Sequence, residues 1–187
     1  MPFHPTEFPD LFLFEPRVFE DKRGYFFESY NQTVFQEAGF QYNWVQDNQS
    51  RSSYGVVRGL HYQTEPHTQA KLVRVLQGTI WDVVVDLRIG SPTYGRSYGV
   101  ELSAENKWQI LVPKGFAHGF SVLSDTVEVL YKCDDYYNKE SEQGIRWNDP
   151  DLVIDWKIPA DKMIISEKDL THPFFKDSHH QFRFHGA

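Results

Sequence analysis

Apolar and polar residues alternate with a period of two through the middle of the chain. In the stretch 81–88, four apolar residues share one face, and Asp82, Asp86 and Arg88 share the other. This alternation is typical of a β-strand, because successive side chains point to opposite faces. Similar strands are expected at 56–62, 71–77, 97–103, 108–112, 118–123 and 126–133. Many short strands separated by turn residues indicate a mostly β sandwich or barrel.

Helical signals are few and short. Asn31 can cap a helix over 32–38, which Gly39 can end. A second short helix is expected near 166–170, within a less regular segment, 139–170, that wraps the strands. The tail 171–187 is rich in His and Phe and is expected to be partly ordered. No linker interrupts residues 1–187, so we expect a single domain.

Composition and charge narrow the function. The 187-residue chain has a formal net charge of -7, with 40% hydrophobic and 16% aromatic residues, so a global basic surface for nucleic acid is absent. No apolar run is long enough to cross a membrane, and the first residues do not resemble a signal peptide. The only cysteine, Cys133, is expected to be a small buried residue. A single cysteine suits a reducing cytosol, so we expect a cytoplasmic protein with no nucleic-acid or membrane partner.

Four residues carry side chains suited to proton transfer. His61 carries an imidazole, a group well suited to act as a base near neutral pH. Lys71 and Tyr131 lie on expected strands, and Asp169 offers a carboxylate near the C-terminal end. Such a set needs neither a metal nor a redox cofactor. Each residue alone also has an ordinary interpretation as a structural histidine, a surface lysine, a core tyrosine or an acid in a helix cap that begins at Ser166.

Five segments of the chain form a recognisable set. They are Arg58-Gly59-Leu60-His61-Tyr62-Gln63, Lys71-Leu72-Val73-Arg74-Val75, Gly115-Phe116-Ala117-His118-Gly119-Phe120, Gly144-Ile145-Arg146-Trp147-Asn148-Asp149-Pro150 and Ser166-Glu167-Lys168-Asp169. In this order and at this spacing they resemble the dTDP-4-dehydrorhamnose 3,5-epimerase family, over a region from about Pro16 to Asp169. The resemblance implies a cupin-type double-stranded β-helix, or jelly-roll, barrel with a few short helices. It also implies a homodimer.

The resemblance implies a reaction on a dTDP-linked 4-keto-6-deoxyhexose. The enzyme would invert carbons 3 and 5 of dTDP-4-dehydro-6-deoxy-D-glucose, giving dTDP-4-dehydro-L-rhamnose for dTDP-L-rhamnose biosynthesis. The ketone at carbon 4 acidifies the protons on both carbons, so the reaction requires a base, an enolate stabiliser and an acid. No hydride moves, and the chain has no Gly-x-Gly-x-x-Gly fingerprint, so no cofactor is expected.

The family's roles carry over to particular residues. The resemblance implies that His61 is the base, Asp169 its partner, Tyr131 the proton donor and Lys71 the enolate stabiliser. It implies substrate contacts for Arg23, Glu28, Gln46, Asn48, Arg58, Lys71, His118, Tyr137, Glu142 and Lys168.

Three details of this carry-over concern position. The region of Arg23 and Glu28 would reach into the partner's site. Tyr137 would stack on thymine, with the adjacent Tyr136 as the alternative. Arg58 and His61 are three residues apart, and a regular strand would turn them to opposite faces, so a bulge is expected at Gly59.

Three other functions remain open at this stage. A relative that inverts only carbon 3 or only carbon 5 would use the same residues. A non-catalytic sugar-binding cupin is disfavoured by the intact set of His61, Tyr131 and Asp169. A metal-dependent cupin usually shows His-x-His, whereas this chain has His61-Tyr62-Gln63, so we expect no catalytic metal.

Overall fold

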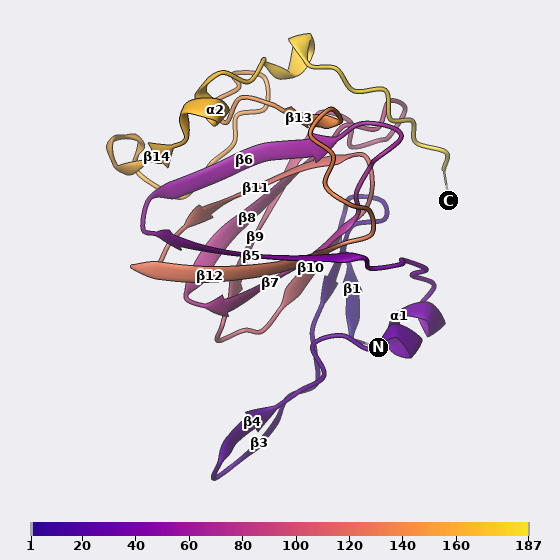
Figure 1. The fold of residues 1–187 in the computed structure, drawn as a ribbon, viewed down its shortest axis with the longest axis vertical. Coiled ribbons are helices and arrows are strands. Elements are labelled where there is room, and N and C mark those ends of the chain that lie inside the picture. The colour runs from indigo at the N-terminus through magenta and orange to yellow at the C-terminus, as the bar shows by residue number, and fades with distance from the viewer. Residues whose placement is uncertain (1, 187) are drawn as a thin grey trace.

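Two β-sheets lie face to face and enclose the main hydrophobic core (Figure 1). The computed structural model describes residues 2–186. The strand order in the first sheet is β1 (Phe3–Pro5), β2 (Phe12–Phe14), β10 (Gln109–Val112), β7 (Lys71–Gln77), β12 (Thr126–Cys133) and β5 (Gln46–Ser53). The order in the second is β13 (Glu142–Gly144), β6 (Val56–Gln63), β11 (Phe116–Val122), β8 (Thr79–Asp86) and β9 (Ser97–Ser103), with β14 (Ile164–Ile165) parallel to β6.

The remaining elements are short. A hairpin of β3 (Phe19–Asp21) and β4 (Gly24–Phe26) projects away from both sheets (Figure 1). The helices are α1 (Gln32–Glu37), α2 (Glu167–Leu170) and the 3₁₀ turns η1 (Ala160–Lys162) and η2 (Phe175–Asp177). Within residues 2–186, no helix is long and apolar enough to span a membrane.

The expected elements are largely confirmed. Each strand expected from the alternation is present, with ends that differ by no more than two residues, and α1 has Asn31 as its N-cap. Strand β5 was not identified from the sequence because Gln46, Asn48 and most of their neighbours are polar. Its inward positions are half-buried and line a polar cavity, so it lacks an apolar stripe. The expectation of a single domain stays a prediction.

Strand β8 is buried on both faces, and its polar face is the one that points inward. Asp82 and Asp86 are fully buried, and they share their face with Val84 of the core between the sheets. The apolar face, which includes Val83 and Val85, packs outward against the segment 144–182. Covering of the outer face by this segment explains why alternation alone did not reveal which side of β8 faces the interior.

The expected irregularity at Gly59 is confirmed. Strand β6 pairs with β11 so that His118 lies opposite His61 and Phe120 opposite Arg58, and the register shifts between these pairs. Gly59 has a φ of 112°, and a Cβ there would lie 2.7 Å from the Cα of Gly119. The inserted residue lets Arg58 and His61 share the inner face although they are three residues apart.

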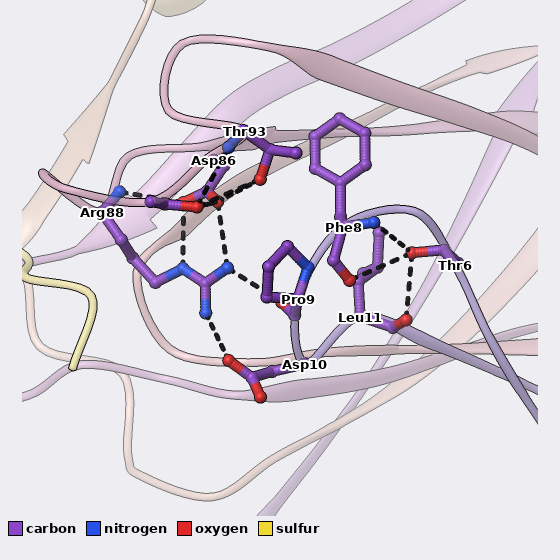
Figure 2. A network of polar contacts seen from close by, with 9 residues as sticks. Thr6, Phe8, Pro9, Asp10, Leu11, Asp86, Arg88 and Thr93 are labelled. Carbon is purple, nitrogen blue, oxygen red and sulfur yellow. Dashed lines mark hydrogen bonds and ion pairs between the residues drawn. The ribbon is translucent and has the colours of Figure 1, made fainter. Parts of the chain in front are cut away.

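A buried arginine ties the end of β8 to the N-terminal turn (Figure 2). Arg88 donates from Nε and Nη2 to the two carboxylate oxygens of Asp86, each at 2.9 Å, and from Nη2 to the carbonyl of Pro9 at 2.8 Å. Burial alone would raise the pKa of Asp86, but hydrogen bonds from Arg88, Ser91 and Thr93 hold it below its usual value. The guanidinium also lies 4.5 Å from the Phe116 ring centroid.

We predict that Arg88→Met lowers the free energy of unfolding by about 3–5 kcal/mol at pH 7, because it leaves the Asp86 carboxylate charged in the core without its cation. Urea unfolding followed by circular dichroism measures the change. The matched control is Lys157→Met, which breaks an exposed pair with Asp155 and is expected to cost less than about 1 kcal/mol. Equal losses in the two variants would contradict the role given to Arg88.

Candidate active site

A cavity of about 300 Å³ lies between the two sheets, at the end where β13 forms the edge of the second sheet. Its lining consists of polar and aromatic side chains from both sheets: Gln46, Asn48, His61, Tyr62, Gln63, Gln69, Lys71, Tyr131, Tyr137 and Glu142. Of the four residues expected to move protons, His61, Lys71 and Tyr131 line it directly. The fourth, Asp169, contacts it through His61.

His61 and Asp169 form a close pair. The Nε2 atom of His61 lies 2.6 Å from Oδ1 of Asp169, whose side chain is 4% exposed. The other carboxylate oxygen accepts a long hydrogen bond of 3.4 Å from the backbone N–H of Gly59. Because Nε2 faces a carboxylate, it carries the ring proton, and Nδ1 keeps the lone pair that a base needs.

The helix-cap interpretation of Asp169 is half right. The hydroxyl of Ser166 accepts a hydrogen bond of 3.1 Å from the backbone N–H of Asp169, so the N-cap of α2 is present. In a full capping box the acid would return a bond to the backbone of the cap residue. Here the carboxylate of Asp169 is directed to His61 instead. The cap therefore fixes the backbone that presents the acid.

The electrostatics of Asp169 follow from its contacts. Burial alone would raise the pKa of its carboxyl group, but polar contacts with His172 and His61 outweigh burial and hold the pKa far below its usual range. Asp169 is consequently an anion at neutral pH, and it can stabilise a positive charge on His61.

Lys71 and Tyr131 come from the opposite sheet. Lys71 of β7 pairs with Cys133 of β12, and Tyr131 lies two residues earlier on the same face as Cys133. Burial lowers the pKa of Lys71, and burial raises the pKa of Tyr131. Tyr131 therefore keeps its proton at neutral pH. The thiol of Cys133 is buried, as expected, and accepts from Asn48 Nδ2 at 3.7 Å.

A second histidine–carboxylate pair lies deeper between the sheets. His118, opposite His61, has its Nε2 2.8 Å from Oδ2 of the fully buried Asp82. His118 is 7% exposed and is not part of the cavity lining. Arg58 donates from Nε to the hydroxyl of Ser52 at 3.1 Å. Both residues were expected to contact substrate, and in this structure they stand behind or beside the lining.

The rim of the cavity is held by hydrogen bonds among expected substrate contacts. The hydroxyl of Tyr137 donates to Oε2 of Glu142 at 2.8 Å, and Nζ of Lys168 lies 2.6 Å from the same oxygen. The backbone N–H of Tyr137 donates to Oε1 of Gln46 at 2.9 Å. The ring of Tyr137 lines the cavity, whereas Tyr136 contributes only its carbonyl, which accepts from Gln63 at 3.2 Å.

Two expected substrate contacts lie away from the cavity. Arg23 is at the tip of the β3–β4 hairpin, where its side chain is 83% exposed and pairs with Asp21. Glu28 accepts from Nδ2 of Asn31 at 3.2 Å, beside a separate cavity of about 550 Å³ near α1. A single chain does not bring either residue to His61.

Four residues in or beside the site were not identified from the sequence. Gln63 and Gln69 line the cavity, Asp82 supports His118, and His172 lies 3.4 Å from Oδ1 of Asp169. Gln63 stands in the same motif as His61, which was a usable signal. His172 could have been placed by its spacing, because residues three apart on a helical turn share a face.

Comparison with known proteins agrees with the fold and with this geometry. A family model described as dTDP-4-dehydrorhamnose 3,5-epimerase matches residues 5–177. A dTDP-4-dehydrorhamnose 3,5-epimerase of Pseudomonas aeruginosa is 56% identical over 171 residues, which are 91% of this chain and 93% of the relative.

Solved structures extend the likeness to three dimensions. The crystal structure of dTDP-4-dehydrorhamnose 3,5-epimerase from Elizabethkingia anophelis is 58% identical, with a TM-score of 0.90 over 94% of this chain and 96% of that chain. A dTDP-6-deoxy-D-glucose-3,5-epimerase from Legionella pneumophila, solved in complex with dTDP-4-keto-L-rhamnose, is 47% identical. Its TM-score is 0.90 over 94% of this chain and 93% of that chain.

The barrel and its cavity therefore define an isomerase of the cupin type, built as a jelly roll around a proton-transfer site. More narrowly, the chain belongs to the dTDP-4-dehydrorhamnose 3,5-epimerase family.

Proposed function

We propose that the chain inverts carbons 3 and 5 of dTDP-4-dehydro-6-deoxy-D-glucose, producing dTDP-4-dehydro-L-rhamnose for rhamnose biosynthesis. The observation that carries the proposal is the 2.6 Å contact of His61 with Asp169, at a cavity that Lys71 and Tyr131 also line. Relatives named for this activity cover nearly the whole chain. The reaction is a pair of proton transfers, and no step needs a metal or a redox cofactor.

His61 is the base in this proposal. Its Nδ1 lone pair removes a proton from the carbon next to the ketone, and Asp169 stabilises the imidazolium that results. The low pKa of Asp169 suits this role, since the carboxylate stays charged while His61 gains its proton.

Lys71 stabilises the enolate. Charge develops on the ketone oxygen as the proton leaves, and a buried ammonium group nearby is worth far more than one in water. Removal of such a group commonly costs about 10²–10³ in rate.

Tyr131 is the proton donor, and its position suits inversion. His61 belongs to β6 of the second sheet, and Tyr131 to β12 of the first, so they approach a sugar from opposite walls. Inversion requires that a proton leave from one face and return to the other. The raised pKa of Tyr131 keeps the phenol protonated, and therefore able to donate, at neutral pH.

The remaining contacts would hold the nucleotide sugar. Tyr137 at the rim would stack on thymine, with Gln46, Asn48, Glu142 and Lys168 around it. Arg58 and His118 would add positive charge or hydrogen bonds near the sugar and diphosphate. Small adjustments of the two side chains would be needed for direct contact, because both already have partners in Ser52 and Asp82.

We further propose a homodimer in which the β3–β4 hairpin completes the partner's cavity. The hairpin exposes Phe19, Tyr25 and Phe26, which are 50–66% exposed, along with the side chain of Arg23. Exposed aromatic rings on a projecting arm are typical of an interface. A cytoplasmic location, expected from the single buried thiol of Cys133, stays a prediction.

The test of the function is proton NMR in D₂O with the dTDP-linked 4-keto sugar. We predict deuterium at both carbons 3 and 5 together with an L-configured product. His61→Ala and Asp169→Asn should each slow the exchange by about 10²-fold or more. His4→Gln is the control, because it removes an exposed histidine–carboxylate pair with Glu15 that is not part of the cavity lining, and it should leave the exchange unchanged. Near-normal exchange in His61→Ala would rule out the assigned base, and deuterium at one carbon alone would identify a single-carbon epimerase.

We predict that Tyr131→Phe separates proton removal from inversion. Phe keeps the ring and its packing, so the fold should persist, but the hydroxyl is lost. Proton removal by His61 does not need the donor. The variant should therefore still exchange substrate protons with D₂O while forming much less inverted sugar. An undiminished rate of double inversion would make Tyr131 a core residue only.

We predict that two inactive variants restore activity to each other if the hairpin acts on the partner. Arg23→Glu leaves its own His61 intact, and His61→Ala leaves its own hairpin intact. In a mixed dimer one cavity receives both wild-type parts, so co-expression in equal amounts should restore roughly a quarter of the sites. No recovery, with mixed dimers present by mass spectrometry, would mean that Arg23 does not act across the interface.

A further inference from the structure

The imidazole of His172 is buried beside Asp169, and its Nε2 makes only one long contact there. Its Nε2 has no hydrogen bond within residues 2–186, although it lies 3.4 Å from Oδ1 of Asp169. The side chain is only 12% exposed. Because this contact is longer than an ordinary hydrogen bond, the lone pair or proton of Nε2 is incompletely used and the atom is free to bind a ligand.

The position of His172 is built into the fold. A Cβ at Gly144 would lie 2.4 Å from Nε2 of His172, so the glycine makes the space that the ring occupies. Arg146 donates from Nε to the carbonyl of His172 at 3.1 Å. The ring packs edge-on against His61, with 5.6 Å between ring centroids. The imidazole is therefore held in place against the dyad.

Three ligand atoms converge here. One atom each from His61, Asp169 and His172 lie within 4.8 Å of one another. We propose that these three residues form a binding site for a divalent transition-metal ion, with Zn²⁺ as the ion of matching chemistry, and that the ion inhibits the enzyme. Two imidazole nitrogens and a carboxylate oxygen are a donor set that zinc accepts, with a fourth position left open.

The ion has a route to the site. His61 lines the cavity, and its side chain is 33% exposed, so an ion in the cavity reaches this ring, which has to turn to present Nε2. Zinc bonds of about 2.0–2.2 Å need the ligand atoms to be slightly more than 3 Å apart. The Asp169–His172 distance of 3.4 Å already fits, and the closer His61 has to move outward from its 2.6 Å contact.

Inhibition follows from the position of one proton, and this step rests on the proposed role of His61 as base. In the dyad the proton is on Nε2 and the lone pair on Nδ1. Zinc takes the electron pair of Nε2, so the ring proton moves to Nδ1 and no net proton is released. An Nδ1 that carries a proton cannot accept one from the sugar. The ion therefore blocks the base and also separates it from Asp169.

Binding is tested first without substrate, so that the result is independent of the proposed reaction. Calorimetry with Zn²⁺ and the visible spectrum with Co²⁺ should show one site per chain in the wild type. His172→Phe keeps a ring of similar size against Gly144, and His172→Gln is a second variant in case the first folds poorly. Each should weaken binding by more than about tenfold, since even residues behind the ligands are worth about 10–100-fold.

The matched control is His4→Gln. His4 pairs with Glu15 at 2.9 Å on the surface, without a second histidine in reach, and its loss should leave binding unchanged. Absence of one-to-one binding in the wild type would overturn the proposal. Affinity that survives both His172 variants, or that falls equally in His4→Gln, would also overturn it.

Inhibition is then measured as the ratio of turnover with and without Zn²⁺ for each protein, which cancels any change in the variant's own rate. The wild type should lose activity on addition of Zn²⁺ and regain it with EDTA. The His172 variants should need more than about tenfold more Zn²⁺ for the same loss. One-to-one binding through His172 with no inhibition would keep the metal site and refute the role of His61 as base.

Discussion

The site depends on one irregularity, the extra residue at Gly59 in β6. Without it, Arg58 and His61 would face opposite sides of the sheet, and one of the two would point away from the space between the sheets. The bulge also returns Leu60 and Tyr62 to the outer face, where they hold the segment that carries Asp169. Gly59 and Gly119 approach so closely that a side chain on either would clash with the other strand's backbone. Two glycines thus set the orientation of the base and the docking of its partner.

The jelly-roll fold places the candidate reactive groups on two facing sheets. In the proposed reaction, a sugar held between the sheets would meet His61 on one side and Lys71 with Tyr131 on the other, whereas a site on a single sheet would offer groups to one face only. The charged groups also lie on opposite sides of the cavity. The anion of Asp169 lies behind the base, and the cation of Lys71 lies across the cavity. The buried anion of Asp169 is stabilised by groups fixed in the fold rather than by water, so little rearrangement is needed beside His61 when charge develops in the reaction.

Much of this architecture could be predicted from the residues. Period-two alternation identified the strands that contribute apolar side chains to the core. The three-residue spacing of Arg58 and His61 predicted the bulge that the structure contains. Strand β5 was not predicted because its inward residues face a polar cavity. The alternation of apolar and polar residues that identifies a half-buried strand was therefore absent. The inward face of β8 was not predicted because the segment 144–182 covers its other, apolar face, so both faces are buried. The contact of His172 with Asp169 depends on space left by Gly144, and packing of that kind is not encoded in local periodicity. The proposed role of the β3–β4 hairpin came only from the family resemblance. Nothing in its own residues indicates whether it contributes to the site of its own chain or to that of a partner.

The His61–Asp169 pair joins positions 108 residues apart, and the later one lies near the C-terminal end. The strands that enclose the cavity are all complete well before that point in the chain. During synthesis, the strands that form the walls therefore leave the ribosome before the partner of the base. During synthesis the nascent barrel can enclose its core while its base remains without a counter-charge, so the chain acquires shape before it acquires reactivity. Closure of so distant a contact costs more chain entropy than local hairpin formation, so we expect the pair to form after the hairpins.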